Sequence, residues 1–184
     1  MAKKLWEASK DQKLNSNLYD YKKFISNKFN LKLSQNYKDI FNWSINNSGN
    51  FWSSIWDYCK IKGIKSNKEL KISNIFYKNI FLPKSKLNFS ENLLLKNNKS
   101  KAVTFISENG FREERNWLEL NNNVSKIIKF LKKKKLKKND RVVAYLPNYI
   151  ETVEAFLATS SLGAIWSSCS PDFGINGVVE RFSQ

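Results

Sequence analysis

The chain has 184 residues, 41% hydrophobic and 14% aromatic, which is enough apolar material for a packed core and excludes a disordered tail. Its 32 Lys and Arg against 16 Asp and Glu give a formal charge of +16. Only four of the basic residues are arginines, which argues against nucleic acid or an anionic membrane surface as the partner. The absence of histidine excludes a Ser-His or Cys-His triad, and two cysteines are too few for a zinc site or a disulfide framework.

The first third of the chain predicts helices that are rich in aromatic residues. Apolar residues recur at steps of three and four in two segments: Leu14, Leu18, Tyr21 and Ile25, and then Trp52, Ile55, Trp56 and Cys59. The stretch NYKDIFNWSINNSGNFW between them predicts a short helix that ends around Asn47–Gly49. We expect these aromatic side chains to form a core and not a ligand cage.

From Gly63 to Ser100 the pattern becomes irregular, with a proline, short apolar runs and a polar break in FLPKSKLNFSENLLLKNNKS. Such a break marks a domain boundary near Asn97–Ser100. The sequence therefore predicts a helical domain over residues 1–97 and a second domain over residues 98–184.

The second domain opens with a predicted β-hairpin and a long helix. The hairpin consists of AVTFI at Ala102–Ile106, a turn that ends at Gly110, and FREER from Phe111. Asn116 and Glu119 then have the spacing of a capping box, before a helix with one apolar face. The run KKKKLKK at residues 132–138 is typical of a helix C-terminus, where cations face the negative end of the helix dipole.

Two strand and helix units follow. The run RVVAYLPN predicts a strand buried on both faces, and Asn148 with Glu151 predicts the cap of a helix that ends at about Leu162, where Gly163 stops it. AIWSSC predicts a second strand, and apolar residues from Ile175 to Phe182 predict a second helix. Alternating strands and helices indicate an α/β fold, but two strands are fewer than a parallel sheet usually has, so we expect an incomplete sheet.

The second strand is followed by the turn SPDFG. Pro171 presets one backbone angle, Asp172 can accept hydrogen bonds from neighbouring amides, and Gly174 permits a positive φ. The segment could serve only as a tight turn, or it could also contact a ligand. Glu180 and Arg181 lie on the following helix and are expected on its solvated face.

These residues carry a family resemblance. The segments that carry it are LWEAS, WSINNSGNFWSSIWDY, LNFSENLL, RNWLEL, NDRVVAYLPN and YLPNYIETVEAFLATSSLGAIWSSCSPDFGINGVVERFSQ. They are similar, in the same order, to the acetoacetyl-CoA synthetase branch of the acyl-adenylate-forming, AMP-binding enzymes. Among them SSCSPDFG is the most specific, since related acetyl-CoA synthetases have a glycine- and phenylalanine-rich loop there.

The resemblance implies a helical N-terminal cap over residues 1–97 and the start of the AMP-binding domain over residues 98–184. It also implies a ligase that activates acetoacetate with ATP and Mg²⁺ as an acyl adenylate and passes the acyl group to CoA. The family's ATP loop and catalytic lysine would follow Gln184, so the resemblance assigns no catalytic or metal-binding residue here and implies that these residues alone are inactive. By the same resemblance, Ser170, Pro171 and Asp172 would lie near the adenine of CoA.

Other functions remain open at this stage. The acid could be acetate, propionate or another short acid, or the chain could be a non-catalytic, Lys-rich module that binds nucleic acid or anionic surfaces. The ligase interpretation predicts small-molecule partners, with neither nucleic acid nor a membrane. No run of about 18 apolar residues occurs, and the start MAKKLWEASKDQ lacks the apolar stretch of a secretory signal, so we expect a cytoplasmic protein.

Overall fold

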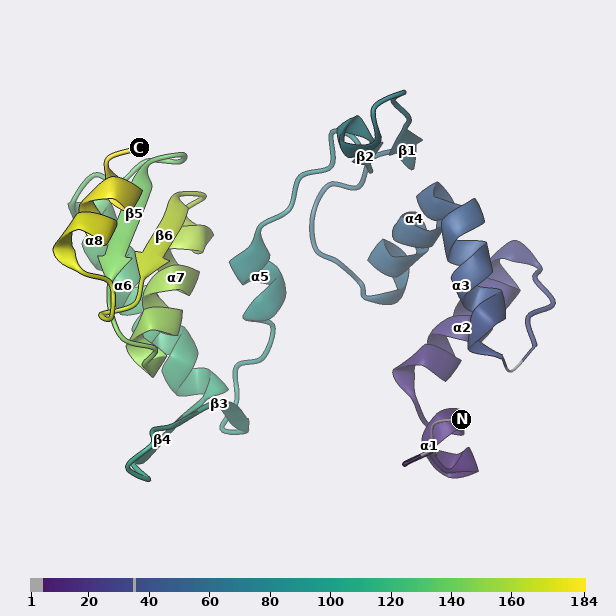
Figure 1. Ribbon diagram of the computed structural model, residues 1–184, viewed down its shortest axis with the longest axis horizontal. Coiled ribbons are helices and arrows are strands. Elements are labelled where there is room, and N and C mark those ends of the chain that lie inside the picture. Colours follow the sequence, from purple (N-terminus) through teal and green to yellow (C-terminus); the bar gives the residue numbers. More distant parts are fainter. Residues whose placement is uncertain (1–4, 35) are drawn as a thin grey trace. The chain divides into compact units, whose positions relative to one another are not determined.

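A computed structural model describes residues 5–34 and 36–184; residues 1–4, which begin the segment MAKKLWEASKDQ, and residue 35 lie outside it. The chain forms two compact units, Met1–Lys86 and Leu87–Gln184, and each has its own elements (Figure 1). This division precedes the boundary expected near Asn97–Ser100. The reason is that the hydroxyl of Ser90 is buried and donates a hydrogen bond of 2.8 Å to the carbonyl of Leu157. The assignment of the family's cap and AMP-binding domain to residues 1–97 and 98–184 stays a prediction.

The first unit is mainly helical. Its elements are α1 (Lys10–Leu14), α2 (Asn17–Phe29), α3 (Tyr37–Asn46), α4 (Ser48–Tyr58), β1 (Leu70–Lys71), the 3-10 helix η1 (Phe76–Lys78) and β2 (Ile80–Phe81). Tyr21 and Ile25 of α2 and Ile40 of α3 form the buried centre, with aromatic rings around them. The predicted aromatic core is confirmed, and the hydroxyls of Tyr21 and Ser54 share a buried hydrogen bond of 2.7 Å.

Asp57 is the charged centre of the first unit. It pairs with Lys28 and with Lys65, whose Nζ lies 2.6 Å from Oδ1 of Asp57 and donates a second hydrogen bond to the carbonyl of Ser53. Burial alone would raise the pKa of Asp57, but the hydrogen bonds from the two lysines outweigh it, so the pKa lies below its usual value of 3.8. These pairs hold the end of α2 and the segment after α4 against α4.

The depressed pKa of Asp57 predicts a pH dependence of stability. Because the folded-state value lies below the unfolded one, the stabilisation is fully present above the unfolded pKa and is lost as pH falls through the folded pKa. We expect Asp57→Asn to lower the stability of the first unit by about 1 kcal/mol near neutral pH, since the site is partly solvated. This difference should shrink as pH falls below about 4.

The measurement is hydrogen exchange of the α2 and α4 amides across this pH range, with Glu69→Gln as the control. Glu69 is exposed and has no ion pair within residues 5–34 and 36–184. A pH-independent difference between the wild type and Asp57→Asn would contradict the assignment.

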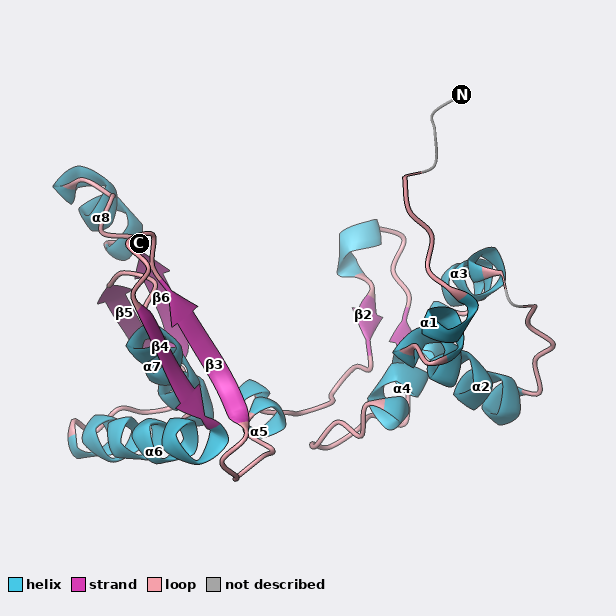
Figure 2. Cartoon of the chain, turned by 90° about the horizontal axis from the view of Figure 1, so that it is seen from below, coloured by secondary structure: helices cyan, strands magenta, loops and turns pink. Residues whose placement is uncertain are grey.

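The second unit has the predicted mixture of strands and helices. Its elements are α5 (Phe89–Leu93), β3 (Lys101–Ile106), β4 (Arg112–Asn116), α6 (Trp117–Lys133), β5 (Arg141–Tyr145), α7 (Ile150–Ser161), β6 (Ile165–Cys169) and α8 (Ile175–Phe182). Strands β3 and β4 form an antiparallel hairpin, whereas β5 and β6 are parallel, with Val142 opposite Trp166 (Figure 2). The α/β fold class is confirmed, with both strand pairs where the sequence predicts them.

The core of this unit lies between α6 and α7. Leu120 and Val124 of α6 meet Leu157 and Ala158 of α7, and all four are almost completely buried. The predicted capping box is present, since the Asn116 side chain accepts from the Glu119 amide while the Glu119 carboxylate accepts from the Asn116 amide. The α6 helix also ends in the lysine run as expected, with Lys132 and Lys133 in its last turn.

The two ends of α7 differ in how well the sequence predicted them. Asn148 does not cap the helix: the N-cap is Tyr149, without a side-chain cap, and the Thr152 hydroxyl donates back to the carbonyl of Pro147 at 2.7 Å. Gly163 is the predicted stop, with φ of 68° and the Ala164 amide bonded to the carbonyl of Thr159 at 3.2 Å. A Cβ at Gly163 would lie 3.2 Å from Cγ of Lys138, so both the space and the backbone favour glycine.

Within residues 5–34 and 36–184, no helix combines the length and the apolar character that crossing a lipid bilayer requires.

Candidate functional site

The predicted site lies at the carboxyl ends of β5 and β6. Because the two strands are parallel, Tyr145 and Cys169 end side by side, and the chain then enters the turn Ser170–Gly174 before α8. Ligands of open α/β sheets collect at this edge, beside the N-termini of the following helices. The three predicted residues, Ser170, Pro171 and Asp172, are consecutive there and all exposed.

The turn is closed by its own side chains. The Ser170 hydroxyl donates to Oδ2 of Asp172 at 2.7 Å, and the Phe173 amide donates to the Ser170 carbonyl at 3.1 Å. Gly174 has a φ of −63°, so it is the N-cap of α8 in extended backbone and does not use the positive φ expected of it. A Cβ at Gly174 would meet nothing within 4 Å, so neither strain nor space requires glycine there.

Tyr145 holds the turn against the end of β5, which the sequence did not predict. Its hydroxyl lies 2.7 Å from the carbonyl oxygen of Pro171 and 3.0 Å from that of Phe173, and it is the donor to both. The alternation of β5 places Tyr145 on the face opposite Val142 and Ala144. The prediction that β5 is buried on both faces is wrong, because Val143 and Tyr145 on this face are each 50% exposed.

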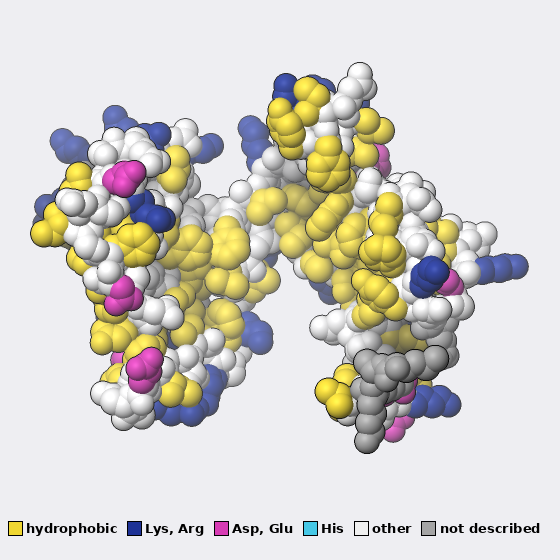
Figure 3. All heavy atoms as spheres, in the orientation of Figure 1, with side chains coloured by type: hydrophobic (Ala, Val, Ile, Leu, Met, Phe, Trp, Pro, Cys, Tyr) yellow, Lys and Arg dark blue, Asp and Glu magenta, His cyan; other side chains and the backbone are white. Residues whose placement is uncertain are grey.

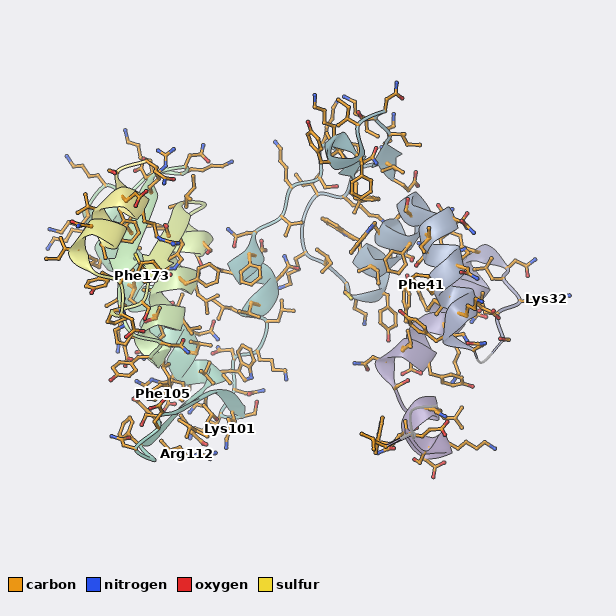
Figure 4. The ribbon with its side chains drawn as sticks, viewed as in Figure 1. Lys32, Phe41, Lys101, Phe105, Arg112 and Phe173 are labelled. Atoms are coloured by element: carbon orange, nitrogen blue, oxygen red, sulfur yellow. The ribbon has the colours of Figure 1, made fainter. Side chains whose placement is uncertain are left out.

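Phe173 and Arg181 form a second contact beside the turn. The guanidinium carbon of Arg181 lies 4.9 Å from the centre of the Phe173 ring, and Figure 4 shows Phe173 at this end of the unit. Arg181 is exposed, as expected for the solvated face of α8, and its guanidinium also contacts the Phe173 ring of the turn. The exposed carboxylate of this region could accept a hydrogen bond from the amino group of a purine, and the guanidinium could attract a phosphate. The proline and the aromatic ring add apolar surface beside them.

An ion cluster that includes the buried carboxylate of Glu154 connects β4 to α7, the helix next to this edge. Arg115 of β4 lies 2.5 Å from Glu113, 3.3 Å from Glu151 and 3.4 Å from Glu154. The Glu154 side chain is only 5% exposed and also accepts a hydrogen bond of 2.9 Å from Asn123 of α6. The hydrogen bond to Glu113, and then the charges of the three carboxylates, raise the pKa of Arg115.

The described part of the chain contains no group of three or more His, Cys, Asp or Glu residues placed to hold a metal ion. The turn itself offers hydrogen-bond acceptors, an apolar surface and one cation.

Comparison with known proteins gives a consistent family. The AMP-binding enzyme family matches residues 95–183. The acetoacetyl-coenzyme A synthetase of Rhizobium meliloti (strain 1021) is 40% identical over 148 residues, covering 80% of this chain and 23% of its own length. The acetoacetyl-CoA synthetase of Danio rerio is 36% identical over 192 residues, covering 100% of this chain and 27% of its own length.

A solved structure supports the same fold. Acetoacetyl-CoA synthetase from Streptomyces lividans superposes with a TM-score of 0.89 at 23% identity, covering 99% of this chain and 29% of that one. The chain thus spans about a quarter of the length of the proteins that it matches. Residues 95–183 of this chain are therefore similar to the AMP-binding enzyme family.

Proposed function

We propose that this chain forms part of an ATP-dependent, AMP-forming acetoacetate:CoA ligase. The observation that carries the proposal is the similarity to an acetoacetyl-CoA synthetase along 100% of the chain, together with the AMP-binding match in the second unit. ATP, Mg²⁺, CoA and acetoacetate are then the ligands of the whole protein. Two unpaired cysteines, Cys59 exposed and Cys169 buried, fit a reducing cytoplasm.

The reaction would proceed in two balanced steps. A carboxylate oxygen of acetoacetate attacks the α-phosphorus of ATP, and pyrophosphate leaves with the electron pair of the broken P–O bond. The thiolate of CoA then attacks the acyl carbon, and AMP leaves. Carboxylate and triphosphate repel each other, so magnesium and cationic groups must offset their charges while the two are held together.

A chimera tests the proposal. This chain would replace the matching segment of the Danio rerio acetoacetyl-CoA synthetase, and acyl-CoA formation would be measured with acetoacetate, acetate and propionate. We expect a folded chimera to form acetoacetyl-CoA with ATP and CoA. A second arm supplies this chain and the remaining segment as separate polypeptides. A folded, inactive product in both arms would contradict the proposal.

Another acid is the nearest alternative. The malonamoyl-CoA synthetase of Penicillium aethiopicum is 31% identical over 188 residues and covers 98% of this chain, so similarity along these residues accompanies more than one named acid. Malonamate therefore joins acetate and propionate in the same assay. If the chimera prefers one of these acids and the unchanged Danio rerio enzyme does not, the result would favour the alternative.

We also propose that Ser170, Pro171 and Asp172 contact the adenine end of CoA. The exposure of the turn and its position at the carboxyl ends of β5 and β6 support this, and the Asp172 carboxylate is suited to accept the adenine amino group. The proposal agrees with the family resemblance of SSCSPDFG.

A substitution at Asp172 tests that contact. In the chimera we expect Asp172→Ala to raise the KM for CoA about fivefold, the equivalent of one hydrogen bond of about 1 kcal/mol, and to leave adenylate formation without CoA unchanged. Glu180→Ala, an exposed carboxylate on α8, is the control. An unchanged KM for CoA in Asp172→Ala would leave the segment with the role of a turn alone.

A further inference from the structure

The segment from Lys60 to Lys86 carries a local excess of positive charge. It contains eight lysines, one glutamate and no arginine in 27 residues, whereas the whole chain has 32 basic and 16 acidic residues in 184. The ratio of basic to acidic residues is therefore eight here against two overall. A uniform preference for lysine along the chain does not account for that difference.

The fold gathers part of this charge around one hollow. A cleft of about 550 Å³ opens in the first unit, lined among others by Lys65, Lys68, Lys71, Lys84, Ser66 and Pro83. Figure 3 shows dark blue Lys side chains over the β1–β2 region that carries this cleft. Lys65 and Lys84, which are distant in sequence, thus line the same cleft.

Backbone bonds fix the two loops that form the cleft. Ile64 and Lys86 exchange hydrogen bonds of 2.8 and 2.9 Å, and the Ser66 amide donates to the Ser85 hydroxyl at 2.8 Å. The Leu82 amide donates to the Glu69 carbonyl at 2.9 Å. These hydrogen bonds connect the two loops across the cleft, so the backbone that carries the lysines is fixed.

The backbone beside Pro83 is also unusual. Leu82 and Lys84 have φ of 46° and 69°, in the left-handed region that leucine and lysine rarely adopt. Such conformations are strained in non-glycine residues and are found preferentially at functional sites. Here they place Pro83 and Lys84 in the wall of the cleft.

Most of the charge in the cleft is not compensated. Lys65 is paired with Asp57, which it shares with Lys28. Lys68, Lys71 and Lys84 form no ion pair with any of residues 5–34 and 36–184. Three ammonium groups therefore remain for an external anion.

We propose that this cleft binds a small polyphosphate anion of the pyrophosphate type. Several ammonium groups around one hollow suit a ligand with several charged oxygens, and lysine serves as a point charge in phosphate sites. A nucleic acid fits less well, because the described lining includes no aromatic ring for base stacking and the segment has no arginine. The proposal goes beyond the ligase function and does not depend on it.

Calorimetric titration of the full chain with inorganic pyrophosphate tests the site. We expect binding that weakens at least about tenfold in the triple variant Lys68→Gln, Lys71→Gln, Lys84→Gln. The matched control, Lys129→Gln, Lys132→Gln, Lys133→Gln, removes the same charge from the exposed face of α6 in the other unit and should change affinity less than about twofold. Equal losses in both variants would overturn the proposal.

Further arms identify the ligand and the place. Amide shifts of the wild-type chain on adding pyrophosphate should be confined to residues 64–71 and 83–86, which keeps the test independent of variant folding. Orthophosphate should bind more weakly than pyrophosphate, since it offers fewer charged oxygens. Tighter binding of a DNA duplex or of phosphatidylserine vesicles, with the same dependence on Lys68, Lys71 and Lys84, would contradict the assignment.

Discussion

Leu157→Ala should destabilise the second unit by about 3 kcal/mol, within the range of about 2–5 kcal/mol for emptying a leucine site in a core. Leu157 is completely buried and packs with Leu120 and Val124 across the α6–α7 interface. Its carbonyl also holds the buried hydroxyl of Ser90, so a collapse of the neighbouring backbone around the cavity would disturb that bond too.

Hydrogen exchange of the α6 and α7 amides measures this effect within the second unit. Val143→Ala is the control, because Val143 of β5 is 50% exposed and should cost less than about 1 kcal/mol. Slow exchange that is the same in Leu157→Ala and in the wild type would show that α6 and α7 do not form the core of this unit.

Arg115→Met should cost about 3 kcal/mol, because it leaves the buried carboxylate of Glu154 with only the amide of Asn123. The penalty comes from the unpaired buried charge, so a second substitution should relieve it. We expect the double variant Arg115→Met, Glu154→Leu to recover most of the stability, since apolar residues can replace a buried ion pair at little cost.

The matched control is Arg112→Met on the same strand. Arg112 lies 2.6 Å from Glu114, but both side chains are largely exposed, so its loss should cost about 0–1 kcal/mol. The measurement is again hydrogen exchange of α6 and α7. Two results would contradict the claim that Arg115 compensates the buried charge of Glu154. One is an equal effect of Arg112→Met and Arg115→Met, and the other is a double variant no more stable than Arg115→Met.

The local elements of this chain could be predicted from sequence because their signals are local. The capping box of Asn116 and Glu119, the stop at Gly163 and the apolar run of β5 each depend on residues a few positions apart. The same local reasoning failed at Asn148. There the Thr152 hydroxyl donates a hydrogen bond to the Pro147 carbonyl, and the N-cap of α7 is Tyr149. A spacing rule cannot anticipate that competing bond.

The contacts that position the candidate site were beyond sequence reasoning because they join distant residues. Tyr145 and Pro171 meet only because β5 and β6 pair in one register, and Arg115 and Glu154 meet only because the hairpin packs on α7. The place of Leu87–Asn97 in the second unit has the same origin, since Ser90 finds its partner on α7. The choice of Ser170, Pro171 and Asp172 rests on the resemblance of SSCSPDFG, and their contact with CoA stays a prediction.

The most direct test of the proposed ligase function is exchange of labelled pyrophosphate into ATP by the chimera, with CoA omitted. An AMP-forming acetoacetate ligase makes the acyl adenylate before CoA reacts, so the label should enter ATP only when acetoacetate is present. Exchange without acetoacetate, a requirement for CoA, or no exchange by a folded chimera would contradict the account.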